Sequence, residues 1–342
     1  MLAAILKDWN NLVLEDIPTP EPGPGEVLVR IKSCGFCATD YKAIKGTRRN
    51  VDFPLIPGHE PAGVIAGVGP YVKNVKEGDE VILSPSGFCG YCRNCRVGLT
   101  HYCERSYTTG GDGTDVRPGS FAEYTVTGAN VVFAKPKNLS FDVACQSEPV
   151  SGAWKGIIHY SEMAVGDDVV VIGTGGIGMY CLMVAKAAGA GRLIAVDVSE
   201  FALRTARELG ATHTINPTKC DVKTAVYDIL PAGPDLVVEA AGPVKAVELM
   251  VSLVRRGTRW NIFGITTHEK FELDGGLMHF LEARMDSSFS TTPQAIEKAI
   301  RLMDRGLVNV EKVISHRFPL SEIHKAVEAM GSPERNKVVV HP

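Results

Sequence analysis

The feature that most limits the possible folds is an apolar run that leads directly into a glycine-rich turn. Asp168-Val-Val-Val-Ile172 has the unbroken apolar character of a strand buried in a parallel sheet, and Gly173-Thr-Gly-Gly-Ile-Gly178 follows at once. A helical pattern then runs to about Ala188, and the next apolar run, 192–196, ends at Asp197. This order of strand, turn, helix and strand predicts a doubly wound α/β domain with a parallel sheet.

The same turn predicts a dinucleotide site. Small residues let the backbone approach a pyrophosphate, and the start of the helix offers free N–H groups and the positive end of the helix dipole. The residues expected to hold the phosphates are Gly173, Gly175, Gly176, Ile177 and Gly178. Asp197 should accept hydrogen bonds from the adenosine ribose, and its charge favours NAD over a cofactor with a 2′-phosphate. The alternative is an ordinary strand–helix turn with a solvated carboxylate.

Four cysteines form the most specific local signal, in the pattern Cys89-x2-Cys92-x2-Cys95-x7-Cys103. Four thiolates this close can surround Zn²⁺ tetrahedrally at about 2.3 Å per bond. Four protein ligands leave no open position, so this zinc should be structural. An iron–sulfur site is the weaker alternative, because nothing else indicates one-electron chemistry. A redox pair is weaker again, because the cysteines are clustered.

The chain before residue 151 has a different rhythm from the part that follows. Short apolar runs separated by Pro- and Gly-rich turns predict a β-rich, barrel-like domain. We expect this domain to comprise residues 1–150 and 291–342, with the zinc lobe at about 87–105. The dinucleotide-binding domain should span 151–290, and the apolar run 337–341 should rejoin the first domain.

Composition excludes several classes of protein. Lys and Arg total 36 against 39 Asp and Glu, a formal net charge of −3, and no basic stripe suggests nucleic-acid binding. No signal-peptide core or membrane span is evident, so we expect a cytoplasmic protein without a membrane partner. In that compartment, nine cysteines favour metal binding or catalysis over disulfides.

Two further segments carry residues that bind metals. Cys34-Gly-Phe-Cys37-Ala-Thr-Asp40 follows a predicted strand, and Gly58-His59-Glu60 lies in a Pro- and Gly-rich stretch. Taken alone, His59 could be a hydrogen-bonded structural histidine, and Cys34 with Cys37 could be a redox pair.

Together with the cysteine quartet and the glycine-rich turn, these segments resemble the zinc-containing medium-chain dehydrogenase family, over essentially the whole chain. The resemblance implies a GroES-like catalytic domain, a Rossmann domain, NAD, and two zinc ions per chain. It makes Cys37 and His59 ligands of a catalytic zinc, with Glu60 as an alternative ligand. The third ligand separates branches of the family, and Glu148, followed by Pro, matches the polyol (sorbitol-type) and threonine branch. Cys145 is the rival, since simple alcohol dehydrogenases use cysteine there.

The resemblance also assigns roles around the metal. Asp40 should hold the non-ligating ring nitrogen of His59, and Thr39 should take the proton of the alcohol. The family commonly has His where this chain has Lys42. Either the proton leaves by another path, or Lys42 binds a cofactor or substrate group. Relatives form homodimers or homotetramers.

The predicted function is therefore zinc-dependent hydride transfer from a secondary alcohol to NAD⁺. The expected partner is a small polar molecule such as a polyol or a hydroxy-amino acid. A primary alcohol dehydrogenase or aldehyde reductase is the alternative with the same chemistry. A non-catalytic zinc- and NAD-binding protein, or a quinone-reductase-like relative, is the alternative from another class.

Overall fold

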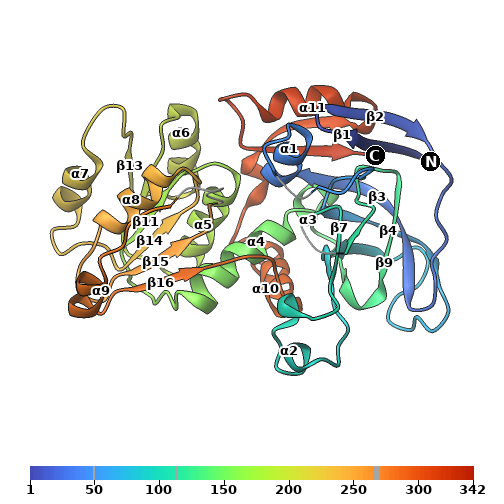
Figure 1. The fold of residues 1–342 in the computed structure, drawn as a ribbon, viewed down its shortest axis with the longest axis horizontal. Coiled ribbons are helices and arrows are strands. Elements are labelled where there is room, and N and C mark those ends of the chain that lie inside the picture. Colours follow the sequence, from blue (N-terminus) through green and yellow to red (C-terminus); the bar gives the residue numbers. More distant parts are fainter. Residues whose placement is uncertain (49–50, 112–114, 265–269) are drawn as a thin grey trace.

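The computed structural model describes residues 1–48, 51–111, 115–264 and 270–342. Two β-rich halves lie side by side, each around its own main sheet, and helices α4 (Ser147–Trp154) and α10 (Pro293–Asp304) lie between them (Figure 1). The predicted α/β class with a parallel sheet is confirmed.

Within the described residues, one half contains a six-stranded, fully parallel sheet. Its spatial order is β13 (His213–Ile215), β12 (Leu193–Val196), β11 (Val169–Ile172), β14 (Leu236–Glu239), β15 (Arg259–Ile262) and β16 (Arg284–Ser287). The connecting helices are α5 (Gly176–Ala187), α6 (Glu200–Leu209), α7 (Val222–Ile229), α8 (Val244–Ser252) and α9 (Gly275–Leu281). The central strands are buried on both faces, which explains their continuous apolar sequences.

The other half contains a seven-stranded sheet in the described part of the chain. Its path is β10 (Val132–Ala134), β5 (Glu80–Leu83), β4 (Glu60–Val68), β3 (Glu26–Phe36), β18 (Lys337–His341) and β17 (Ile314–Pro319), and β9 (Tyr124–Gly128) also pairs with β3. The apolar run 337–341 thus forms a strand antiparallel to β3.

Smaller elements complete the structure. Two strands, β1 (Leu2–Asp8) and β2 (Asn11–Asp16), form a hairpin, and a three-stranded sheet joins β6 (Ser86–Gly87), β7 (Tyr107–Thr109) and β8 (Val116–Arg117). The remaining α-helices are α1 (Ala38–Ile44), α2 (Arg93–Arg96), α3 (Phe141–Ala144) and α11 (Ile323–Met330). A π-helix, η3 (Lys155–Tyr160), continues α4, and 3₁₀ turns cover η1 (Thr100–Tyr102), η2 (Ala129–Val131), η4 (Val310–Val313) and η5 (Leu320–Glu322).

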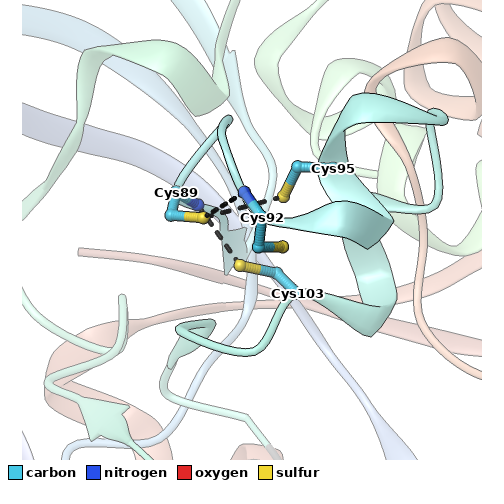
Figure 2. Close-up of side chains that lie close together, drawn as sticks. All are labelled: Cys89, Cys92, Cys95 and Cys103. Atoms are coloured by element: carbon cyan, nitrogen blue, oxygen red, sulfur yellow. Dashed lines mark hydrogen bonds between the residues drawn. The ribbon is translucent and has the colours of Figure 1, made fainter.

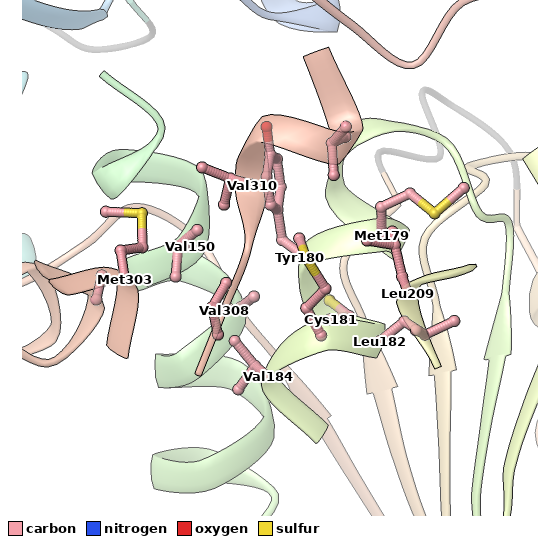
Figure 3. Packing of buried hydrophobic residues seen from close by; sticks show 14 of the residues in the cluster. Val150, Met179, Tyr180, Cys181, Leu182, Val184, Leu209, Met303, Val308 and Val310 are labelled. Carbon is pink, nitrogen blue, oxygen red and sulfur yellow. The ribbon is translucent and has the colours of Figure 1, made fainter. Parts of the chain in front are cut away.

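An apolar core joins the two halves where α4, α5 and α10 meet (Figure 3). Val150 from α4, Met303 from α10 and Tyr180 from α5 are all buried in it. The Tyr180 hydroxyl donates to the buried side-chain carbonyl of Gln146, immediately before α4. Because close-packed cores resist displacement, α4 is held in a fixed position between the two sheets.

The division into domains at about residues 150 and 290 stays a proposal. All strands of the six-stranded sheet, β11–β16, lie between these two boundaries in the sequence. All strands of the seven-stranded sheet lie before the first boundary or after the second. Among the described residues, no helix has both the length and the apolar character needed to cross a bilayer.

Candidate active site

Cys37 and His59 meet at the ends of neighbouring strands. Cys37 is the N-cap of α1, directly after β3, and His59 directly precedes β4. Asp40 links them: its Oδ1 lies 3.1 Å from His59 Nδ1, and its Oδ2 accepts from the backbone N–H of Cys37 at 3.0 Å. Burial lowers the pKa of His59, but the charges of Asp40 and Cys37 outweigh it and raise that pKa overall. Asp40 thereby occupies Nδ1 and leaves Nε2 as the ring nitrogen available to a metal.

The donor atoms of Cys37, His59 and Glu60 all lie within 4.8 Å of one another, and the predicted ligand Glu148 is not part of this group. Glu60 also forms an ion pair with Lys337, in which the side chains are only 1% and 5% exposed. Burial lowers the pKa of Lys337, but the charge of Glu60 reverses this and raises that pKa. Glu60 is therefore already neutralised by a fixed ammonium group.

Glu148 begins α4 and lines the same cavity as these three residues. Burial raises the pKa of its carboxyl to about 7, with His59 acting to lower it and Glu60 to raise it. Among the described residues, the Glu148 carboxylate has no hydrogen bond and no ion pair. The rival Cys145 is 1% exposed, its Sγ donates to the Asp142 carbonyl at 3.2 Å, and it does not line the cavity. A metal beside His59 can therefore be reached by Glu148 more readily than by Cys145.

One cavity of about 510 Å³ connects this cluster to the glycine-rich turn. Thr39 and Lys42 from α1 line it. The dinucleotide half contributes Gly173, Gly175, Gly176, Ile177, Asp197, Ala240, Ala241, Phe263, Gly264 and Ser288 to Ser290. The residues predicted for the catalytic metal and, except for Gly178, those predicted for the cofactor thus face a single space.

The glycine-rich turn leaves open space where a phosphate would lie. A Cβ at Gly175 or Gly176 would meet no atom of a described residue within 4 Å, whereas one at Gly178 would lie 1.8 Å from the Gly173 carbonyl oxygen. Gly178 therefore permits close helix–strand packing, and the other two permit a close backbone approach to a ligand. Asp197 follows β12, and its Oδ2 accepts from the Thr174 N–H at 2.7 Å.

A buried carboxylate shapes the loops beside this space. The Oε1 of Glu239, at the end of β14, accepts from the N–H groups of Ala241 and Gly242, both at 2.7 Å. Burial raises the pKa of Glu239, although these hydrogen bonds act to lower it. A Cβ at Gly264 would lie 2.3 Å from the other carboxylate oxygen, so the two loops pack tightly around Glu239.

The four sulfur atoms of Cys89, Cys92, Cys95 and Cys103 face one another in a lobe around α2 and η1 (Figure 2). All four thiols are free, and backbone N–H groups of Cys89 and Arg105 point at the Cys103 sulfur at 3.3 Å. Hydrogen bonds from backbone N–H groups also lower the pKa of the Cys92 thiol to about 6. They outweigh the desolvation of the thiol, which acts to raise that pKa. This donor set fits a closed tetrahedral Zn²⁺ site.

Two lysines near the metal cluster were missed by the sequence analysis. Lys337 is the first residue of an apolar strand, and a charged residue at that position suggests a strand end exposed to water. In the structure it is buried and forms an ion pair with Glu60. Lys155 is 1% exposed and donates from Nζ to the Phe289 carbonyl at 2.6 Å. Lys155 lies seven residues after Glu148 on a continuous helix, and this spacing places two residues on the same helix face. The spacing was therefore a sequence signal that Lys155 lies near Glu148.

Two family descriptions match this chain, "alcohol dehydrogenase GroES-like domain" over residues 23–137 and "zinc-binding dehydrogenase" over residues 176–305. The chain belongs to the zinc-containing medium-chain dehydrogenase family. This dehydrogenase is 31% identical to an L-threonine 3-dehydrogenase from Anaeromyxobacter sp. (strain Fw109-5), over 96% of this chain and 95% of the relative.

Solved structures show the same fold over the full length. A zinc-binding dehydrogenase from Sinorhizobium meliloti 1021 bound to NADP has a TM-score of 0.93 and 29% identity, covering 100% of this chain and 99% of that chain. Galactitol-1-phosphate dehydrogenase from Escherichia coli has a TM-score of 0.91 and 26% identity, covering 100% of both chains. The predicted family and activity are confirmed: the dehydrogenase is a zinc-dependent oxidoreductase that acts on the CH–OH group of a small alcohol with a nicotinamide cofactor.

Proposed function

We propose that this dehydrogenase oxidises a secondary alcohol within a polyol, a hydroxy-amino acid or a similar polar molecule, using NAD⁺. The observation that carries this proposal is the free carboxylate of Glu148 in the cavity beside His59. With Glu60 neutralised by Lys337, we assign Cys37, His59 and Glu148 as the ligands of the catalytic zinc, and Glu60 as the alternative. The names of the threonine and galactitol-phosphate relatives support a polar substrate.

Three protein ligands leave one position for the substrate oxygen. When bound, zinc would act as a Lewis acid on the substrate oxygen, and the nicotinamide cofactor would supply the hydride acceptor. Thr39 lines the cavity two residues after Cys37, and we assign its hydroxyl to receive the proton of the alcohol. Asp40 fixes the tautomer of His59 through Nδ1. We assign the glycine-rich turn to the pyrophosphate and Asp197 to the adenosine ribose.

An anionic substrate is the second candidate. Lys42 and Arg335 both line the cavity, and neither forms an ion pair with a described residue. Either cation could bind a cofactor phosphate or an acidic group on the substrate. Lys42 stands where the family commonly has a histidine, so the proton need not leave by the usual relay.

The deciding experiment measures NADH formation over polyols, threonine, hydroxy acids, phosphorylated alcohols and ethanol. Preference for polyols or threonine supports the first proposal, and preference for phosphorylated alcohols supports the second. Faster turnover of ethanol-like substrates would contradict both. Zinc content is measured on the same preparation, where two zinc ions per chain are expected and one would contradict the catalytic assignment.

We further propose a homodimer or homotetramer, testable by analytical ultracentrifugation. The partly exposed edge strand β16 and the 74% exposed Phe280 of nearby α9 support this. A cytoplasmic location stays a prediction from the sequence.

A further inference from the structure

The segment Ser288–Ser290, directly after β16, forms one wall of the cavity. Ser290 has a φ of +63°, in the left-handed region that residues with a Cβ rarely adopt. Such a conformation persists only where the surroundings hold it, and it is concentrated at binding and catalytic sites.

The helix that carries Glu148 holds this wall in place. Lys155, on the π-helical continuation of α4, donates to the Phe289 carbonyl at 2.6 Å, and the Ser151 hydroxyl hydrogen-bonds to Thr291. A Cβ at Gly156 would lie 3.1 Å from that of Ser288. Glu148 and the wall are therefore positioned by one continuous helix.

Two hydroxyl groups meet on this wall from opposite halves of the molecule. Ser86 in β6 and Ser290 after β16 both line the cavity, and their Oγ atoms lie 3.1 Å apart. A hydroxyl offers one donor and two acceptor positions, so the pair uses one donor and one acceptor. Neither hydroxyl bonds to any other described residue. One donor and three acceptor positions therefore remain for a ligand.

We infer that Ser86 and Ser290 bind a second hydroxyl group of the substrate while its reacting hydroxyl lies at the metal cluster. Lys155 is a positioning residue for this pair, since it holds the Phe289 carbonyl directly before Ser290. The inference rests on the proposed function, and it narrows the substrate class to alcohols with at least two hydroxyl groups. A simple alcohol would leave the pair without a partner and would be oxidised less efficiently.

The test compares two alcohols with the same carbon skeleton, butane-2,3-diol and butan-2-ol, on the full-length zinc-loaded enzyme with NAD⁺. The measured quantity is the ratio of kcat/KM for the diol to that for the mono-alcohol. We expect Ser86→Ala and Ser290→Ala each to lower this ratio about tenfold, the effect of one lost hydrogen bond. Turnover of butan-2-ol should change less than about twofold. The matched control is Ser252→Ala, which removes a hydroxyl on α8 that donates to the Leu249 carbonyl.

An unchanged ratio in both serine variants, with both alcohols still oxidised, would overturn the serine assignment and leave the proposed function intact. The serine assignment would also be overturned, and the proposed function kept, if the wild type prefers threonine to the diol and both serine variants keep that preference. If the wild type forms NADH from none of these alcohols, nor from sorbitol or threonine, the proposed function fails and the inference with it.

Lys155 has a separate readout. Lys155→Met should raise KM for the diol and leave kcat/KM for butan-2-ol nearly unchanged, and Lys155→Arg should restore part of the diol preference by keeping a donor. Equal losses for both alcohols would show a merely structural role and contradict the positioning assignment. Because this buried substitution can impair folding, the serine variants decide the inference independently.

Discussion

Glu60 and Lys337 form an ion pair inside the protein, with both side chains almost completely shielded from water. Removing one partner of a buried pair leaves an uncompensated charge. We therefore expect Lys337→Met to lower the free energy of unfolding by about 3–5 kcal/mol. Denaturant unfolding followed by circular dichroism measures this change.

The matched control for that experiment is Lys325→Met. Lys325 pairs with Glu322 on the surface, where the two side chains are 63% and 40% exposed. Exposed pairs contribute little, so a change of at most about 1 kcal/mol is expected. If both substitutions change the free energy of unfolding equally, burial of the Glu60–Lys337 pair does not increase its contribution to stability.

Replacing Asp40 should weaken metal binding more than folding. Asp40→Asn keeps the shape of the side chain but removes its negative charge and replaces one of the two carboxylate oxygens that face His59 Nδ1 and the Cys37 backbone N–H. Loss of such an outer partner lowers metal affinity about 10- to 100-fold. Competition with a zinc chelator measures this affinity. If neither of the two zinc sites binds more weakly in Asp40→Asn, the proposed role of Asp40 is contradicted.

The two proposed zinc sites should respond differently to loss of one cysteine. Cys37→Ala should abolish turnover and leave one zinc per chain with little loss of stability, because the four-sulfur lobe is untouched. Cys95→Ala should remove the other zinc and lower the melting temperature, since a structural zinc stabilises its own loop. Zinc content, activity and thermal unfolding are measured on both variants. Normal activity of Cys37→Ala would refute the ligand assignment.

Asp197 should determine the preference for NAD⁺. Asp197→Asn removes the charge that opposes a 2′-phosphate and keeps an oxygen for the Thr174 N–H. We expect the ratio of kcat/KM for NADP⁺ to that for NAD⁺ to rise about tenfold, equivalent to roughly 1.4 kcal/mol. The exposed Asp228 of α7 provides the control, Asp228→Asn. A wild-type enzyme that already prefers NADP⁺, the cofactor bound by the Sinorhizobium relative, would contradict the assignment.

Lys155 should make stability depend on pH. Burial lowers its pKa to about 8 in the folded protein, although Glu148 acts to raise it. The unfolded state therefore binds more protons between about pH 8 and pH 10, and stability attributable to this residue rises across that window. The free energy of unfolding of the wild type should therefore increase relative to that of Lys155→Met as the pH rises from 8 to 10. A difference that stays constant with pH would show that Lys155 titrates normally.

The sequence predicts those features whose residues lie close together along the chain. The strand–turn–helix around Gly173 and the cysteine quartet are local patterns, and the structure forms the first as β11 and α5 and clusters the second. The Glu60–Lys337 and Ser86–Ser290 contacts depend instead on strand register and on how the two halves pack. Neither is encoded in local periodicity, so neither could be predicted.

The position of β18 has a consequence for synthesis of the protein. This strand, Lys337–His341, lies between β3 and β17 and brings Lys337 to Glu60. While the ribosome is still translating the chain, β3 therefore lacks one neighbouring strand and Glu60 lacks its cation. N-terminal regions generally fold first, and unpaired strand edges are prone to aggregation. The sheet around β3 can therefore be completed only after Lys337–His341 have been synthesised.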